Sequence, residues 1–178
     1  YQTFTDNLAA SIYQQGAQAR ELGDLAAAAG HFLRVKDAAP DSSIRASAEY
    51  DAAAALMRLE DWATAGNVLE SFRDAFPEHE LQRDATQQLA MVYQEDGQLS
   101  RSAAEYERVS AEAEDPQLSR EALLLAGDLY EEAGAMASAL DVYQRYVTQF
   151  PEPVEVPLRL VLVQSTCPFT WRSGSLKL

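Results

Sequence analysis

Few side chains in this sequence are of a type and spacing that could perform chemistry. The two histidines, His31 and His79, have carboxylates nearby but no second metal ligand of another kind at helical spacing. The single cysteine, Cys167, has no histidine near it in sequence, and a thiol nucleophile needs a positioned base. The pair Ser173-Gly174 is too short for a phosphate-binding loop. The sequence therefore predicts no catalytic residue, no metal site, no cofactor and no enzymatic activity.

Carboxylates are abundant, but no pair of them is marked out for acid–base catalysis. The 178 residues include 28 Asp and Glu against 14 Lys and Arg, which gives a net charge of -14. Solvated helix surfaces account for most of this charge. The acidic balance excludes nonspecific binding to nucleic acid, which needs clustered basic residues. The sequence also has no apolar run of about 18 residues, so it predicts no direct membrane insertion.

The elements that would position any functional side chain are clearest between residues 120 and 151. Apolar and small residues recur there at three- and four-residue steps, which is typical of two amphipathic helices. Gly134 interrupts the pattern and Pro151 ends it. Gly127 and Ala139 are small where the two helices of a hairpin would cross, so the backbones are expected to approach closely there.

The same pattern recurs every 37 residues toward the N-terminus. The position of Gly127 is small in each unit, and so is the position of Ala139. The turn position of Gly134 is glycine in three units out of four, with Glu60 in the second. The columns are Gly16, Ala53, Ala90 and Gly127; Ala28, Ala65, Ser102 and Ala139; and Gly23, Glu60, Gly97 and Gly134. Such a period indicates stacked supersecondary units that share one continuous core.

These columns resemble the tetratricopeptide repeat, over residues 9 to 151. The resemblance implies an all-α fold, a right-handed α-α superhelix of four helix-turn-helix repeats of 37 residues. The units are expected at about 9–45, 46–82, 83–119 and 120–155. The longer units, ending in Phe-Pro, are similar to tetratricopeptide domains of bacterial cell-envelope proteins. Helices are expected at residues 1–22, 24–37, 44–59, 62–75, 80–95, 98–113, 117–132 and 135–150, with Thr5 or Asp6 capping the first and Asp61 the fourth.

The resemblance further implies a concave groove lined by the first helix of each unit. Its first half offers tyrosine, methionine and arginine, which are types enriched at binding hot spots. Its second half is acidic, and a partner with a basic segment would match it. Lysine and asparagine are missing from the places where chaperone-tail-binding members hold a terminal carboxylate, so that function is excluded. The residues expected to bind the partner are Tyr13, Arg20, Tyr50, Met57, Arg58, Gln87, Met91, Gln94, Leu124, Asp128 and Glu131.

The expected function is a non-catalytic scaffold that binds a peptide or protein partner in this groove. A bacterial envelope assembly, in the periplasm, is the expected setting, with the cytoplasm as the alternative. Two other functions stay open: a regulatory or substrate-recruiting domain of a larger protein whose catalytic part is absent, and a self-association module. The chain begins at Tyr1 without a signal-like segment, which suggests an excised piece or a mature form.

Residues 156–178 differ in composition from the rest of the chain. They contain no acidic residue, and VPLRLVLV is apolar at nearly every position. Three interpretations stay open for this segment. It is an end foreign to the native chain or out of frame, or a cap over the fourth unit, or a surface through which two copies form a homodimer.

Overall fold

The computed structural model describes residues 2–151 of the chain, and the side chains from residue 4 onward. This part folds into eight α-helices and contains no β-strand. The all-α prediction is therefore confirmed. The helices are α1 (Gln2–Glu21), α2 (Leu25–Ala38), α3 (Ile44–Arg58), α4 (Trp62–Ala75), α5 (Gln82–Glu95), α6 (Leu99–Glu112), α7 (Pro116–Glu132) and α8 (Met136–Gln149).

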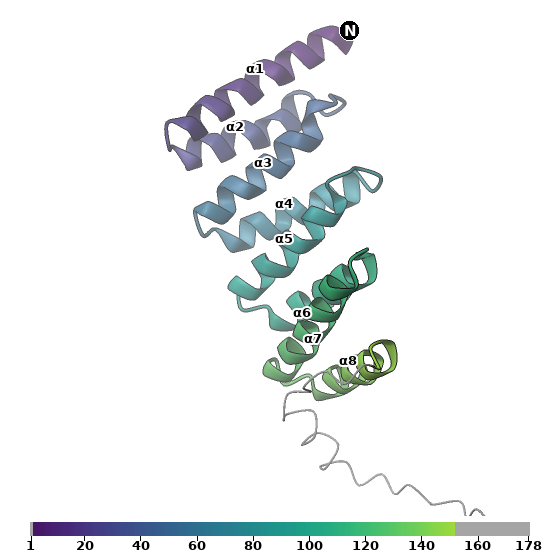
Figure 1. Cartoon of the computed structure of the whole chain (residues 1–178). Helices are drawn as coiled ribbons and strands as arrows, with labels where there is room; N and C mark the ends of the chain where they lie inside the picture. The colour runs from purple at the N-terminus through teal and green to yellow at the C-terminus, as the bar shows by residue number, and fades with distance from the viewer. Residues whose placement is uncertain (1, 152–178) are drawn as a thin grey trace, which may run out of the picture.

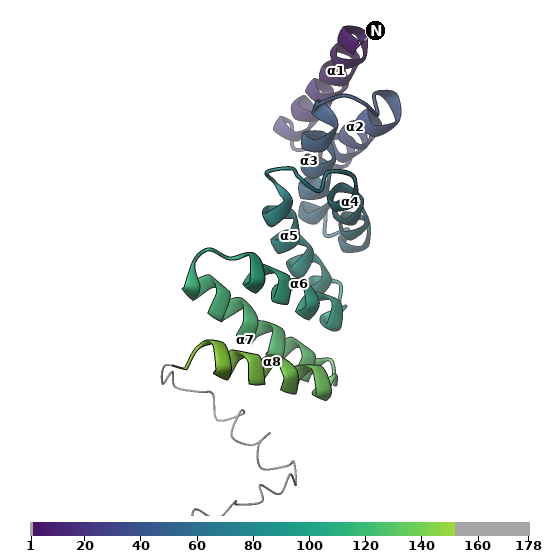
Figure 2. The same ribbon diagram turned by 90° about the vertical axis from the view of Figure 1, so that its right-hand side faces the viewer.

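The helices stack in chain order into one elongated array, with α1 at one end and α8 at the other (Figure 1). Each helix packs against the next one along the chain, and α1 also contacts α3. A view turned by 90° shows the same order and the change in helix direction along the stack (Figure 2). The described residues thus form a helical-repeat superhelix, in which each pair of helices contacts mainly its neighbours.

The 37-residue period is present in the geometry of the second helices. Helices α2, α4, α6 and α8 have 14 residues each, and each begins 37 residues after the one before it. The turn before each of them requires a left-handed residue, with φ of +81° at Gly23, +59° at Glu60, +73° at Gly97 and +74° at Gly134. The left-handed conformation explains why glycine recurs at this position.

Close helix crossings occur where the small residues predicted them. A Cβ atom placed on Gly127 would lie 2.4 Å from Cε1 of Tyr143, and one placed on Gly16 would lie 2.7 Å from the ring of Phe32. In both units the aromatic ring of the second helix therefore rests directly on the backbone of the first. Only glycine leaves room for such a contact.

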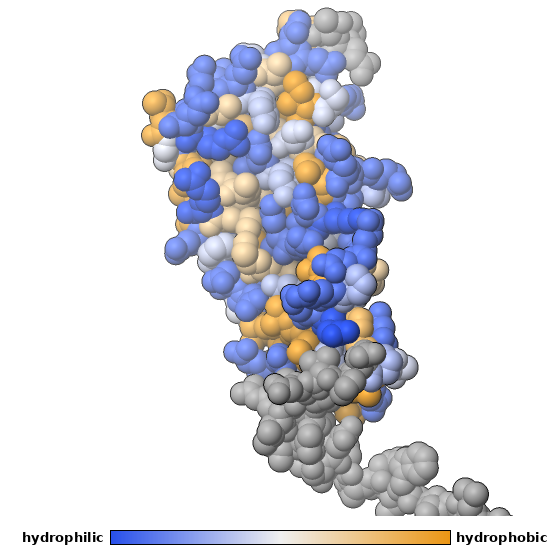
Figure 3. Space-filling model, in the orientation of Figure 1, coloured by the Kyte–Doolittle hydropathy of each residue, from blue (hydrophilic) through white to orange (hydrophobic). Residues whose placement is uncertain are grey.

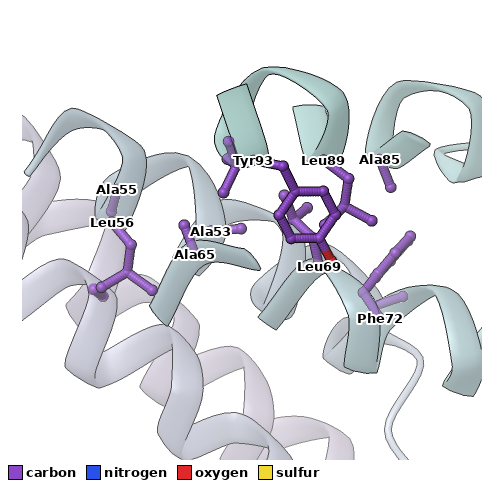
Figure 4. Close-up of a cluster of buried hydrophobic side chains, with 12 residues drawn as sticks. Ala53, Ala55, Leu56, Ala65, Leu69, Phe72, Ala85, Leu89 and Tyr93 are labelled. Atoms are coloured by element: carbon purple, nitrogen blue, oxygen red, sulfur yellow. The ribbon is translucent and has the colours of Figure 1, made fainter. Parts of the chain in front are cut away.

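Buried apolar side chains form two main regions on either side of the α5–α6 junction. One cluster links α1, α2 and α3, and it adjoins a second that runs from α2 to α5 and contains Leu69, Phe72 and Leu89 (Figure 4). A separate cluster joins α6, α7 and α8 around Leu123 and Tyr146. Polar contacts cross between the regions. Arg73 of α4 donates two hydrogen bonds to Glu105 of α6, and the buried Ser102 hydroxyl donates to the carbonyl of Ala90 at 2.7 Å.

The structure corrects the N-terminal capping prediction. Neither Thr5 nor Asp6 caps α1, because the helix already begins at Gln2. The carboxylate of Asp6 instead accepts a hydrogen bond from Ser42 Oγ at 2.8 Å, in the linker before α3. Capping by Asp61 is confirmed, since its side chain accepts from the backbone N–H of Thr64. The interpretations of residues 156–178 lie outside the described residues.

Candidate partner-binding surface

The candidate binding residues lie on α1, α3, α5 and α7, the first helices of the four pairs, and we call their shared surface the first-helix face. The structure leaves them unequally accessible. Half-buried are Tyr13, Tyr50, Met57, Leu124 and Glu131, whereas Arg20, Arg58, Gln87, Met91, Gln94 and Asp128 are exposed.

In the first repeat, the candidate residues are bound to the protein itself. The Tyr13 hydroxyl donates a hydrogen bond to Oδ2 of Asp51 on α3, and the Arg20 guanidinium lies 3.3 Å from the same oxygen. The Tyr13 ring lies 5.1 Å from the Phe32 ring, and Arg20 lies over that ring as well. Burial, followed by the hydrogen bond to Asp51, raises the pKa of Tyr13. Tyr13 and Arg20 therefore tie α1 to α3.

The equivalent tyrosine of the second repeat is also bound to the next first helix. The Tyr50 hydroxyl accepts a hydrogen bond from Nε2 of Gln88, and Gln88 follows Asp51 by one period, as Tyr50 follows Tyr13. The Tyr50 ring lies 5.9 Å from the ring of Phe72. Burial and the charges of Asp84 and Asp51 raise the pKa of Tyr50. Both tyrosines thus join successive first helices, so they are less free for a partner than their residue type suggested.

The remaining candidates are more open. Met57 packs against the buried cluster of α2 to α5, while Arg58 is exposed and has no ion-pair partner among residues 2–151. Met91 is 42% exposed, although it is a large apolar side chain. The Gln94 carboxamide accepts a long hydrogen bond of 3.4 Å from Tyr106. The middle of the first-helix face therefore presents apolar and polar groups together.

Acidic groups gather near the end of α7. The Tyr143 hydroxyl donates to Oδ1 of Asp128 at 2.7 Å and lies 3.3 Å from Oε2 of Glu131. Burial, followed by the hydrogen bond to Asp128, raises the pKa of Tyr143. One hydroxyl proton cannot satisfy four carboxylate oxygens, so Asp128 and Glu131 keep free acceptor positions. Glu132 beside them is exposed.

Sequence reasoning missed two hollows in the third and fourth repeats. The third-repeat pit, about 160 Å³, is lined by Arg83, Asp84, Gln87, Val109, Glu112, Ala113, Glu114 and Leu118. The fourth-repeat pit, about 580 Å³, is lined by Asp115, Pro116, Gln117, Arg120, Glu121, Leu124 and Tyr146. One signal was present in the sequence, because the column that holds Tyr13 and Tyr50 continues with the non-aromatic residues Gln87 and Leu124.

Residues 88–152 match the family model described as a tetratricopeptide repeat. Over these residues the chain is similar to the tetratricopeptide repeat. The matched residues run from the middle of α5 through α8, and the resemblance drawn from the residue columns is thereby confirmed.

Several solved structures share the fold, and one of them is described as a tetratricopeptide repeat protein. A tetratricopeptide repeat protein from Parabacteroides merdae ATCC 43184 aligns with a TM-score of 0.59 at 15% identity, over 88% of this chain and 59% of that one. This chain therefore spans less than two thirds of that protein. MamA from Desulfovibrio magneticus RS-1 aligns with a TM-score of 0.53 at 20% identity, over 79% and 74% of the two chains. BtubC from P. vanneervenii aligns with a TM-score of 0.57 at 16% identity, over 98% and 71%. No curated protein matches the chain.

The described part of the chain shows neither a cluster of metal ligands nor a helix suited to span a membrane. Within residues 2–151, no three potential metal-ligating side chains come together. His79 packs edge-on against Phe72, and its Nδ1 accepts a hydrogen bond from the backbone of Leu81. None of the helices in this part of the chain is long and apolar enough to cross a membrane. Figure 3 shows one side as mostly hydrophilic, with small separate apolar patches.

Proposed function

We propose that this protein is a non-catalytic scaffold whose first-helix face forms a concave groove for an extended segment of another protein. Stacked tetratricopeptide hairpins present one surface of successive first helices, a shape suited to a peptide or a helix. The observation that carries the proposal is the exposure of Gln87, Met91, Gln94 and Asp128 along two successive first helices. An exposed methionine flanked by amides and carboxylates offers both apolar and polar contacts.

The charge on this surface favours a partner with a basic segment. Asp84, Glu121, Asp128 and Glu132 are all exposed on α5 and α7, and the whole chain has a net charge of -14. Complementary charge speeds encounter and selects among partners. The tyrosines and arginine of the first two repeats contribute less in this proposal, because they already bind one another across repeats.

The setting we propose is a bacterial envelope assembly, on the strength of the likeness of the long repeat units to envelope tetratricopeptide domains. Fractionation of the native host tests the setting. Recovery of the protein with the periplasm or the membranes supports it, and recovery in the cytosol contradicts it.

Binding is tested by selecting a random-peptide phage library on the immobilised full chain and measuring the affinity of the selected peptides. The variant carries Met91→Ala and Asp128→Asn, two positions of one column. Asparagine keeps an acceptor for Tyr143 and removes only the charge. We expect affinity to fall about tenfold or more, the size of a hot-spot loss.

The matched control carries Met136→Ala and Asp74→Asn. Both side chains are exposed and both lie on second helices. The control makes the same chemical changes away from the first-helix face, so we expect unchanged affinity. Failure to select any peptide, or equal losses in variant and control, would contradict the groove.

A further inference from the structure

The two pits are the same place in two successive repeats. Four lining positions correspond after one 37-residue period: Arg83 with Arg120, Asp84 with Glu121, Gln87 with Leu124, and Val109 with Tyr146. Two hollows that share four equivalent lining positions indicate a repeated feature of the surface. Each pit adjoins the first-helix face, because Gln87 and Leu124 belong to both.

Side-chain size at one lining column differs between the first two repeats and the last two. In the first and second repeats the column holds Tyr13 and Tyr50, whose rings lie against Phe32 and Phe72. In the third repeat a glutamine occupies this position, beside a valine of the second helix. In the fourth repeat a leucine occupies it. Neither side chain covers the area of a tyrosine ring, so space is left between the first helix and the neighbouring elements.

Both pits combine apolar residues with a charged rim in which the carboxylates outnumber the single arginine. Val109 is 5% exposed and Leu118 38%, and they form the apolar part of the third-repeat pit. Tyr146 and Leu124 play the same part in the fourth. A lysine or arginine side chain fits this combination, because its aliphatic stem packs on apolar groups while its charged end stays among carboxylates and water.

The charges at the rims favour a cation. In the third-repeat pit Arg83 pairs with Glu114 at 2.7 Å, which leaves Asp84 and Glu112 without an ion-pair partner within residues 2–151. In the fourth-repeat pit Glu121 accepts a hydrogen bond at 2.9 Å from the neutral amide of Gln117. Asp115 likewise accepts from a backbone N–H. The Arg120 guanidinium lies over the Phe150 ring, 5.2 Å from its centroid.

We propose that the bound segment places two basic side chains, one in the third-repeat pit and one in the fourth-repeat pit. The inference rests on the proposed peptide-binding function and names the part of the partner that gives specificity. The two pits would recognise a lysine or arginine at each of two positions of the bound segment, and the spacing of these positions would match the distance between successive repeats. In the first two repeats the same column holds Tyr13 and Tyr50.

The experiment fills the pits without adding or removing charge. Peptides selected from the random library on the full chain are the probe, and the variant carries Gln87→Tyr and Leu124→Tyr, which copies the first two repeats. We expect the selected peptides to share two basic residues at a constant spacing. We expect their affinity for the variant to fall about tenfold, a loss of about 1.4 kcal/mol.

A second variant, Asp84→Asn with Glu121→Gln, keeps the shape of the pits and removes the charge. It should also bind the peptides more weakly, and its binding should depend less on salt. The matched control is Asp37→Asn with Asp74→Asn, two exposed and repeat-equivalent positions that line neither pit. Circular dichroism confirms that each variant keeps its helices.

The outcomes separate this inference from the proposed function. The proposal that the pits bind basic side chains is contradicted if the selected peptides lack paired basic residues. It is also contradicted if they bind the wild type and both pit variants equally. Neither result contradicts the peptide-binding groove. A selection that yields no peptide contradicts the proposed peptide-binding function itself. Equal losses of peptide affinity in the pit variants and in the Asp37/Asp74 control also contradict the role of the pits, because net charge alone would then explain the binding.

Discussion

Glu60 is the one residue with a positive φ that is not glycine within residues 2–151, and it stands in the turn column occupied elsewhere by Gly23, Gly97 and Gly134. A side chain at φ of +59° brings Cβ close to the backbone, which costs about 1 kcal/mol. The Glu60 side chain is exposed, so nothing is lost from the core when it is removed.

Glu60→Gly should therefore stabilise the protein by about 0.5–1 kcal/mol, measured as the free energy of unfolding in urea. The matched control is Gly97→Ala, which places a Cβ atom at φ of +73° and should cost about 1 kcal/mol. A destabilised Glu60→Gly variant would show that the Glu60 side chain contributes more than its backbone costs.

Tyr130 carries a second prediction at the residue scale. Its hydroxyl donates to Glu107 at 2.9 Å, as the Tyr93 hydroxyl does to Glu70 one repeat earlier. Burial, then the hydrogen bond to Glu107, raises the pKa of Tyr130 from its ordinary value of 10.0 to about 12. The folded state thus favours the neutral phenol. Its contribution to stability is complete below pH 10 and is lost as pH rises through 12.

Tyr130→Phe should lower the free energy of unfolding by about 1 kcal/mol at pH 8, the value of one hydrogen bond. It should also make stability fall less steeply between pH 10 and pH 12, as measured by urea unfolding across that range. Tyr146→Phe is the control, because the Tyr146 hydroxyl has no hydrogen-bond partner within residues 2–151. An unchanged slope for Tyr130→Phe would contradict this role.

At the scale of the helices, most helix positions could be predicted from the sequence, because turns and helix crossings depend on residues that are close together in the chain. The four second helices begin within one residue of their expected positions, since a left-handed turn residue and a small crossing residue recur in each unit. The starts of first helices were harder. Helix α5 begins at Gln82, two residues later than expected, after a turn in which Gln82 Nε2 donates to the carbonyls of Arg73 and Phe76.

The candidate surface was predictable only in part, for a related reason. The period shows which positions share a helix face, but what occupies that face depends on the next repeat. The Tyr13 hydroxyl donates a hydrogen bond to Asp51 of α3, which lies 38 residues away, and no local sequence pattern predicts this contact. The third-repeat pit is likewise lined from α5, α6 and α7 together.

The close crossings give a prediction for a helix pair. Gly127→Ala should destabilise the protein by about 1–3 kcal/mol, because the new methyl group would meet the Tyr143 ring, which two hydrogen-bond contacts hold in place. Gly30→Ala is the matched control on helix α2. A Cβ atom there meets nothing within 4 Å, and alanine should stabilise the helix by about 0.5–1 kcal/mol. Thermal unfolding of both variants tests the register, and equal shifts would contradict it.

At the scale of the whole molecule, the divided core predicts uneven stability. The buried clusters of α1 to α5 and of α6 to α8 are separate, and polar contacts such as the pair of Arg73 with Glu105 connect them. In a repeat array each unit depends on its neighbours, so a break in the buried apolar core lets one side open first. The C-terminal region has the smaller share of the core. Native-state hydrogen exchange in low urea should therefore show α6, α7 and α8 opening together, at a lower free energy than α2 to α5.

Glu105→Gln tests whether the polar junction sets that difference. Glu105 is 7% exposed, and its loss of charge weakens a bidentate contact, so the opening free energy of α6 to α8 should fall by about 2 kcal/mol. Glu112→Gln makes the same change at an exposed position of the same helix and should leave that free energy unchanged. If Glu105→Gln lowered protection equally from α2 to α8, the repeats would open as one unit, and the junction between α5 and α6 would be no weaker than the rest.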